Sequence, residues 1–286
     1  MSEATSLPTL PAMEPTAIPD PAVMTERGAL PVLHWPTLDA AGLQAVITTR
    51  HGGVSDGAYE SLNLGLHVGD EPDAVLSNRR RAAASVSLTL DDLVFCNQAH
   101  GREVVTVTSA DRGRGAHQLD DAIDLADALV TDSPGVGLVV MVADCVPIVL
   151  FDPGRRILGV VHSGWRGTVA KVAAAAIDTM RALGASPEDI LVGVGPAIPA
   201  ERYEVGDEVV AAAEEAFGAQ AHQVISPHPG GRHRFDLWAA NRLVLAEADV
   251  AEKHILSAEL PTGPDTDFFS DRAQRPCGRF AAIARF

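Results

Sequence analysis

The chain is poor in cysteine and in basic residues. Its three cysteines, Cys96, Cys145 and Cys277, form no Cys-x-x-Cys pair, which argues against a disulfide-bonded secreted protein and favours free thiols in a reducing, cytoplasmic environment. Lysine and arginine total 22 against 38 acidic residues, a formal net charge of -16. This charge excludes binding of nucleic acid or an anionic membrane through the general surface field. An anionic ligand therefore needs a local basic pocket.

Long apolar runs are missing as well. The most apolar stretch, Val136–Leu150, is interrupted by Asp144 and Pro147, so no segment reaches the roughly 20 apolar residues of a membrane-spanning helix. Residues 1–28 are rich in Pro, Ala, Thr and acidic side chains and lack a basic start followed by an apolar core, so we expect a disordered tail rather than a signal peptide. Residues 29–286 are expected to form a single catalytic domain, as a monomer or a small homo-oligomer.

Short β-branched runs alternate with alanine-rich stretches from Leu30 onward, without a repeat of fixed period. This alternation predicts an α/β or α+β fold. We expect strands at 45–49, 94–98, 103–107, 136–144, 147–151, 157–161, 190–194 and 280–286, and helices at 73–85, 168–183, 207–217 and 236–248. Strands 94–98 and 103–107 are expected to pair around a corner at His100-Gly101. The nearly continuous apolar runs between residues 136 and 161 predict a mixed buried sheet covered on both faces.

Three reactive side chains lie where an apolar run gives way to a turn: His100, Cys145 and His162. One thiolate and two imidazoles suit zinc, with a fourth position open for substrate or water, and copper is the alternative metal. Spacing alone leaves Cys145 equally open to a structural role as a small buried residue. Asp144 ends an apolar strand and needs a partner there, so we expect it to support the metal or to act as an acid or base.

The segment from His162 to Gly167 predicts an anion site. It runs from a strand into a helix, so free backbone N–H groups and the positive helix end face the space beside His162. Arg166 adds a forked guanidinium suited to phosphate, and Arg50 in the glycine-rich segment 50–57 could add a second. The competing interpretation is that Arg166 pairs with a surface carboxylate and Trp165 belongs to the core.

Several short motifs occur in a fixed order between Ala45 and the C-terminus. They are TRHGGVS (49–55), NLG (63–65), QAHG (98–101), DALVT (127–131), ADCVP (143–147), HSGWRG (162–167), GPAI (195–198), YEVG (203–206) and FFS (268–270). As a set they resemble the multicopper polyphenol oxidase-like, or laccase-domain, family, whose members are regarded as purine nucleoside phosphorylases.

The resemblance implies a four-layer α/β/β/α sandwich and a zinc ion held by His100, Cys145 and His162. It implies phosphorolysis of adenosine, inosine and 5'-methylthioadenosine to the base and ribose 1-phosphate or its methylthio analogue, together with adenosine deamination. Purine nucleosides and phosphate are therefore the expected partners. The catalytic residues expected are Cys145, His162 and Asp144, and the residues expected to bind substrate or phosphate are Arg50, Arg166 and Asn63.

The chain departs from the family pattern mainly in its C-terminal half. Arg202 and Pro261 stand where the family often has cysteine, and Asp271-Arg272-Ala273 stands where it often has Tyr-Arg-Arg. These changes leave the metal trio intact and bear on substrate preference.

Three other functions use the same residues. A copper-dependent polyphenol oxidase is suggested by the family's older name, although no His-x-His pair of a multi-copper cluster is present. A hydrolase or amidase acting on a cell-wall precursor could use Cys145 as nucleophile with His162 or His100 as base. A scaffold with a structural metal would need a fourth protein ligand.

Overall fold

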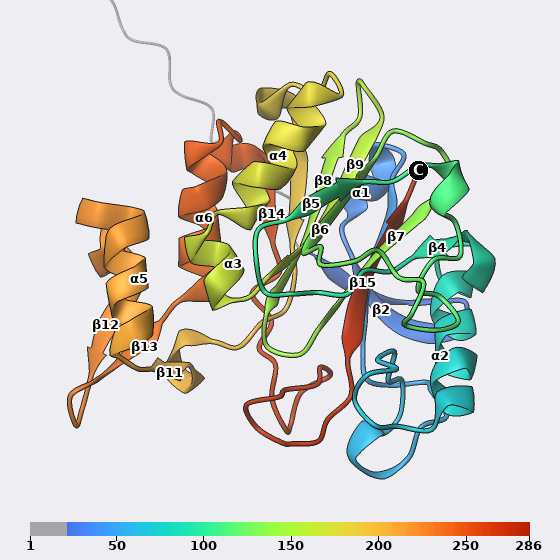
Figure 1. The fold of residues 1–286 in the computed structure, drawn as a ribbon, viewed down its shortest axis with the longest axis horizontal. Coiled ribbons are helices and arrows are strands. Elements are labelled where there is room, and N and C mark those ends of the chain that lie inside the picture. Colours follow the sequence, from blue (N-terminus) through green and yellow to red (C-terminus); the bar gives the residue numbers. More distant parts are fainter. Residues whose placement is uncertain (1–21) are drawn as a thin grey trace, which may run out of the picture.

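The computed structural model describes residues 22–286, and two six-stranded sheets form its centre (Figure 1). The first sheet has the order β1 (Val23–Arg27), β2 (Leu30–His34), β3 (Gln44–Thr48), β15 (Phe280–Arg285), β7 (Gly137–Val142) and β4 (Leu93–Val94). The second has the order β14 (Ile255–Ser257), β10 (Leu191–Val194), β8 (Val146–Asp152), β9 (Ile157–Ser163), β6 (Ala128–Thr131) and β5 (Val104–Thr106). A small third sheet has the order β11 (Glu204–Val205), β13 (Arg232–Phe235) and β12 (Ile225–His228).

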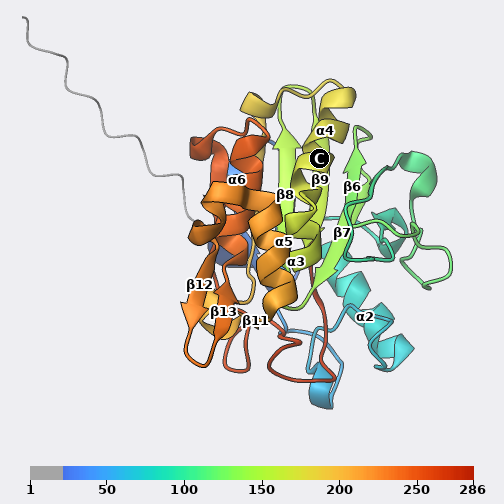
Figure 2. The same ribbon diagram turned by 60° about the vertical axis from the view of Figure 1, so that its left-hand side comes forward.

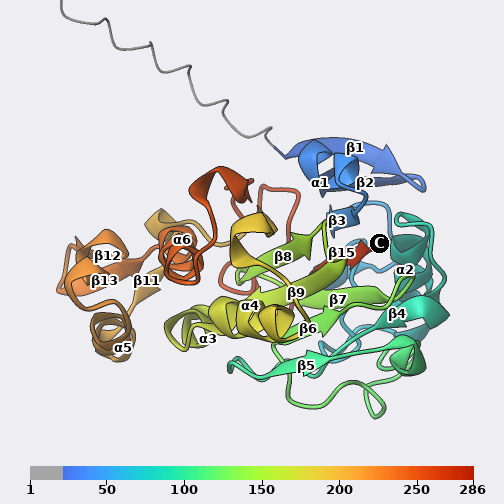
Figure 3. The same cartoon turned by 90° about the horizontal axis from the view of Figure 1, so that it is seen from above.

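Helices cover the outer face of each large sheet, as Figure 3 shows from above. Helix α2 (Pro72–Ala84) covers the first sheet, and α3 (Trp165–Val169), α4 (Val172–Ala182) and α6 (Leu237–Glu247) cover the second. The short helix α1 (Pro36–Ala40) instead packs Leu38 into the cluster between the two sheets, and α5 (Asp207–Phe217) packs beside α3 and the small sheet. Short 3₁₀ turns lie at Gly57–Tyr59, Leu90–Asp92, Ser109–Asp111, Pro187–Asp189, Ala200–Arg202, Gly218–Gln223 and Glu252–His254. Helix α5 and the small sheet lie beyond α6, on the side away from α2 (Figures 1 and 3), and Figure 2 brings this side of the molecule to the front.

Three buried clusters separate four layers. Along β9, Val160 packs between the two large sheets, whereas the next residue, Val161, packs toward α4 and α6. Along β15, Ala282 faces the second sheet and Ile283 packs with Ala83 of α2. Because successive strand residues point to opposite faces, a strand with apolar residues at every position has both faces covered. The predicted α/β/β/α sandwich is confirmed.

Most of the expected elements are present, with corrections. The expected pairing of 94–98 with 103–107 is wrong, because β4 pairs with β7 in the first sheet and β5 with β6 in the second. The expected single helix over 168–183 is wrong too: α3 ends at Val169, and α4 begins after Lys171, whose φ of 61° breaks the helix. The single buried sheet expected between residues 136 and 161 is two sheets, with β7 in one and β8 and β9 in the other.

The prediction of a disordered tail over residues 1–28 is wrong for residues 23–27. Residues Val23–Arg27 form β1, which pairs antiparallel with β2 at the edge of the first sheet. The rest of the tail, residues 1–21, lies outside the described residues, and the assignment of 29–286 to one domain stays a prediction. In the part of the chain that the structure describes, no helix is long and apolar enough to cross a membrane.

Candidate metal centre and substrate cavity

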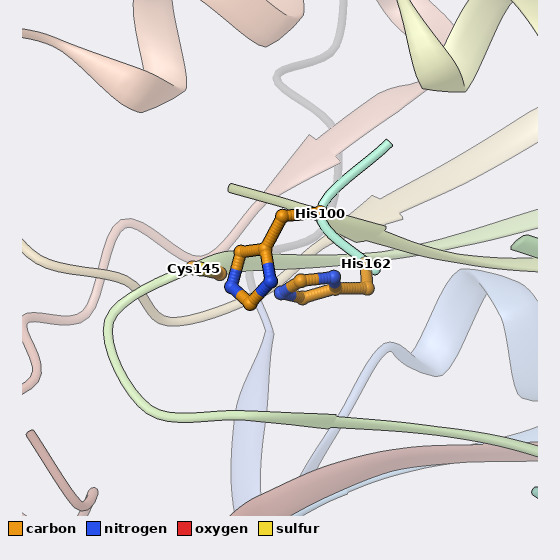
Figure 4. A group of neighbouring side chains, drawn as sticks. All are labelled: His100, Cys145 and His162. Carbon is orange, nitrogen blue, oxygen red and sulfur yellow. The ribbon is translucent and has the colours of Figure 1, made fainter. Parts of the chain in front are cut away.

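The structure brings His100, Cys145 and His162 together. Their ligand atoms all lie within 4.8 Å of one another, and the two imidazole rings meet edge to face with centroids 4.7 Å apart. Figure 4 shows the two rings close together, with Cys145 beside the His100 ring. Soft sulfur and imidazole nitrogen at this spacing match the donor chemistry of zinc and of copper. The residues predicted from the sequence therefore fit a bound metal ion.

Strand register brings these segments to one place. Val146 of β8 is the partner of Ser163 in β9, so Cys145 lies beside the end of β9 and the residue that follows it, Gly164. A Cβ atom on Gly164 would stand 2.9 Å from Cys145 Sγ and 3.2 Å from His100 Cδ2, which is closer than such atoms pack. The close approach of three segments therefore requires glycine at this position.

A buried carboxylate, Asp127, organises two of the three donors. Its Oδ1 accepts from His162 Nδ1 at 2.8 Å and from the His100 backbone N–H at 3.0 Å, and its Oδ2 accepts from the Gly101 N–H at 2.6 Å. Because a carboxylate only accepts, Nδ1 of His162 carries the proton and Nε2 is left for a metal. Asp127 is missing from the residues proposed from the sequence, although it opens the DALVT motif.

The thiol and imidazoles shift one another's protonation. Burial acts to raise the pKa of Cys145, but the charge of His162 and hydrogen bonds from both imidazoles outweigh it and lower the pKa to about 6. Burial acts to lower the pKa of His162, yet Cys145 and Asp127 raise it to about 9. Burial raises the pKa of Cys96, which has no such partners, to about 12. The lowered pKa favours the thiolate of Cys145, the form that binds metals and acts as a nucleophile.

The trio lines a cavity of about 690 Å³, a volume typical of small-molecule sites. Four arginines also line it, Arg166, Arg272, Arg275 and Arg279, together with Tyr203. Arginines thus outnumber the two carboxylates of the lining, Asp144 and Asp271, and give the cavity the local positive charge that an anionic ligand requires in a chain of net charge -16.

Arg166 lies where the sequence placed it, at the start of α3 and in the cavity wall. Its guanidinium stacks 4.1 Å from the centre of the Trp165 ring and pairs with Glu208 at 3.1 Å. Both interpretations of this residue thus find support, since the surface carboxylate and the cavity are both within its reach. The pair is exposed, so it contributes little to stability.

Two other residues expected to bind substrate or phosphate are not brought to this cavity. Arg50 is not among its lining residues; it donates to the Glu60 carbonyl and lies 4.8 Å from the centre of the Phe269 ring. Asn63 is fully buried, and its Oδ1 accepts from the backbone N–H groups of Gly65 and Arg279 at 2.9 Å each. Asn63 therefore holds the chain behind the cavity wall rather than facing its interior.

Asp144 does line the cavity, in a left-handed conformation with φ 86°. Its two oxygens accept from Thr262 Oγ1 and from the Arg272 backbone N–H, so it has the partners that a buried carboxylate needs. None of Arg272, Arg275 and Arg279 is among the binding residues predicted from the sequence, although Arg272 lies in a segment that departs from the family pattern. The available signal was their close spacing after the FFS motif.

A family model described as "Multi-copper polyphenol oxidoreductase laccase" matches residues 44–286. The chain belongs to this family. It is 39% identical to the purine nucleoside phosphorylase YlmD of Geobacillus stearothermophilus over 85% of this chain and 90% of that protein. It is 40% identical to the adenosine deaminase RL5 of an unknown prokaryotic organism, over 81% of this chain and 88% of that protein.

A solved structure shares the whole fold. The crystal structure of YlmD from Geobacillus stearothermophilus superposes with a TM-score of 0.87 at 36% identity, covering 93% of this chain and 99% of that one. The similarity in fold and sequence thus extends over nearly the full length of both chains, and the candidate site lies inside the matched region.

Proposed function

We propose that this protein is a purine nucleoside phosphorylase that also deaminates adenosine. The substrates proposed are adenosine, inosine and 5'-methylthioadenosine, cleaved with phosphate to the base and ribose 1-phosphate or its methylthio analogue. The observation that carries the proposal is that the His100, Cys145 and His162 group and a set of arginines line one cavity of about 690 Å³. The name of one relative supports the phosphorylase activity, and the name of another supports the deaminase activity.

The reaction needs two partners held side by side. In phosphorolysis the bond between the purine nitrogen and C1' breaks, a phosphate oxygen forms a new bond to C1', and the departing base takes up a proton. Holding a phosphate dianion beside the sugar lowers the barrier by removing the entropy cost of the encounter, and cationic donors stabilise the charge as it redistributes. Arginines in the cavity wall, Arg166 among them, are the groups in reach for that task.

The metal proposed is zinc, held by His100, Cys145 and His162. When bound, it would supply Lewis-acid polarisation of a substrate oxygen or a water molecule. The chain's own contribution is to fix the ligands: Asp127 sets the tautomer and direction of His162 and ties down the turn that carries His100. Such outer partners are part of how a metal site is built.

The test is a phosphate-dependent assay with adenosine, inosine and 5'-methylthioadenosine. It compares the parent with Cys145→Ala and Arg166→Ala, and with Arg155→Ala as a matched control, since Arg155 is exposed in the turn between β8 and β9, at the far end of these strands from Cys145. We expect ribose 1-phosphate from the parent and the control, and its loss in both other variants with folding retained. Equal activity in all four proteins would refute the assigned roles.

A hydrolase or amidase acting on a cell-wall precursor through Cys145 is the second candidate, because the lowered pKa of that thiol also suits a nucleophile. Metal analysis of protein purified without added ions, paired with thiol alkylation, separates the two. One equivalent of zinc that protects Cys145 supports the phosphorylase, and bound copper favours the polyphenol oxidase. A metal-free protein whose activity is abolished by alkylation supports the hydrolase.

A further inference from the structure

One wall of the cavity is a loop from the C-terminal part of the chain. The segment between Thr262 and β15 contributes Asp271, Arg272, Arg275 and Arg279 to the lining. Figure 1 shows it as a long red loop that leads into β15. The net charge of the chain is -16. Three arginines of one loop line the same cavity as His100, Cys145 and His162, the candidate metal group, and so place positive charge where it can act on a ligand.

Three of the four arginines in the cavity wall are already paired with carboxylates. Arg275 and Arg279 share Asp271, and Arg166 pairs with Glu208. Within residues 22–286, Arg272 has no carboxylate within ion-pair distance of its guanidinium. Its positive charge is thus the least neutralised among the four.

The guanidinium of Arg272 is nevertheless held in place. It lies 5.1 Å from the centre of the Tyr203 ring, and its Nη1 donates to the Glu204 carbonyl at 3.1 Å. A guanidinium has five N–H donors in a fixed fork, and one of them is used here. The remaining donors are directed by the ring and the carbonyl, which suits two-point binding of a phosphate.

The backbone of Arg272 is tied to the candidate metal group through Asp144. Asp144 Oδ2 accepts from the Arg272 N–H at 2.6 Å, and its Oδ1 accepts from Thr262 Oγ1 at 2.5 Å. The same carboxylate directly precedes Cys145 in the chain and is 8% exposed. The buried side chain of Asp144 thus joins the turn that carries Cys145 to the loop that carries Arg272.

From these contacts we infer that Arg272 binds the phosphate in this cavity and that Asp144 is a positioning residue that sets Arg272 relative to the metal group. The inference rests on the proposed function for the identity of the anion. It replaces Arg50 as the second phosphate-binding arginine and gives Asp144 a task other than proton transfer. Both of its oxygens are already engaged as acceptors, which is the arrangement expected of a group that fixes geometry.

The test measures binding of inorganic phosphate by calorimetry, with the protein zinc-loaded and no nucleoside present. It compares the parent, Arg272→Ala, Arg272→Lys, Asp144→Asn and the control Arg155→Ala, each checked for folding and zinc content. Loss of one charge-assisted contact is expected to raise the Kd for phosphate about tenfold to 100-fold in Arg272→Ala, with a smaller rise in Arg272→Lys. In Asp144→Asn we expect a rise in the Kd and in the KM for phosphate, while kcat at saturating phosphate and its pH profile stay as in the parent.

Phosphate affinity equal to that of the parent in Arg272→Ala overturns the assignment, whether or not the parent cleaves nucleosides. Phosphate binding that depends on Arg272 in a protein that cleaves no nucleoside supports the anion site and contradicts the proposed function. If Asp144→Asn lowers kcat at saturating phosphate and leaves the Kd unchanged, the positioning role is wrong and Asp144 transfers a proton instead.

Discussion

Asp127 offers the sharpest test of how the metal group is assembled. Its carboxylate is fully buried and accepts from His162 Nδ1 and the His100 N–H through Oδ1, and from the Ala99 and Gly101 N–H groups through Oδ2. Replacing it by asparagine keeps the size of the side chain and leaves a single oxygen. Whichever way the amide turns, its NH₂ group faces two donors that the carboxylate accepted.

The expected loss of stability follows from the number of N–H donors left without an acceptor. A buried donor left without an acceptor costs about 1–3 kcal/mol, so Asp127→Asn is expected to lower the free energy of unfolding by about 2–6 kcal/mol. Loss of an outer partner of a metal-binding histidine weakens metal affinity by about tenfold to 100-fold. Both effects arise because His162 and the turn of His100 lose the group that holds them together.

The assay pairs chemical denaturation of the metal-free protein with a competition titration for zinc. Asp124→Asn is the matched control, because Asp124 lies three residues earlier in the same segment and is exposed. It should leave both quantities unchanged. The role given to Asp127 is refuted if Asp127→Asn has a Kd for zinc within about threefold of the parent's and unfolds at the same denaturant concentration.

Three further predictions concern the same region. Gly164→Ala is expected to weaken zinc binding at least about tenfold, because the new Cβ would stand 2.9 Å from Cys145 Sγ. The control Gly206→Ala should bind zinc like the parent, because Gly206 also precedes a helix but a Cβ there would have no other atom within 4 Å. Equal losses of zinc affinity in both variants would contradict the steric argument. In metal-free protein the alkylation rate of Cys145 should rise with pH through about 6 and then level off, because a thiol with a lowered pKa forms the reactive thiolate at a lower pH. An alkylation rate that still climbs steeply above pH 8, or a fast phase that remains in Cys145→Ser, would contradict this prediction. Asn63→Ala leaves the buried N–H of Gly65 and the partly buried N–H of Arg279 without their acceptor and should lower the free energy of unfolding by about 1–6 kcal/mol. A chemical-denaturation curve that overlays the parent's would show that Asn63 has no such role.

Local patterns in the sequence were enough to predict most of the strands and helices and the three metal-donor residues. Uninterrupted apolar runs predicted β7, β8 and β9. Cys145 directly precedes β8 and His162 lies next to the last residue of β9, so these strands carry two of the three donors. These features can be predicted because strand propensity, glycine turns and metal-donor chemistry depend on single residues and their neighbours in the sequence. The same reasoning gave His100, Cys145 and His162, and Arg166 at the start of α3.

Local patterns did not reveal which segments meet in the folded chain. The sequence patterns predicted one sheet and a hairpin at His100. In the structure the chain passes from one sheet to the other at this point, because β4 pairs with β7 and β5 pairs with β6. Likewise Asp127 reaches His162 through the register of β6 on β9, and Arg272, rather than Arg50, reaches the cavity through its bond to Asp144, 128 residues earlier in the chain. Strand pairing and register depend on how whole sheet faces are buried against one another. The spacing of residues along the chain does not specify these contacts.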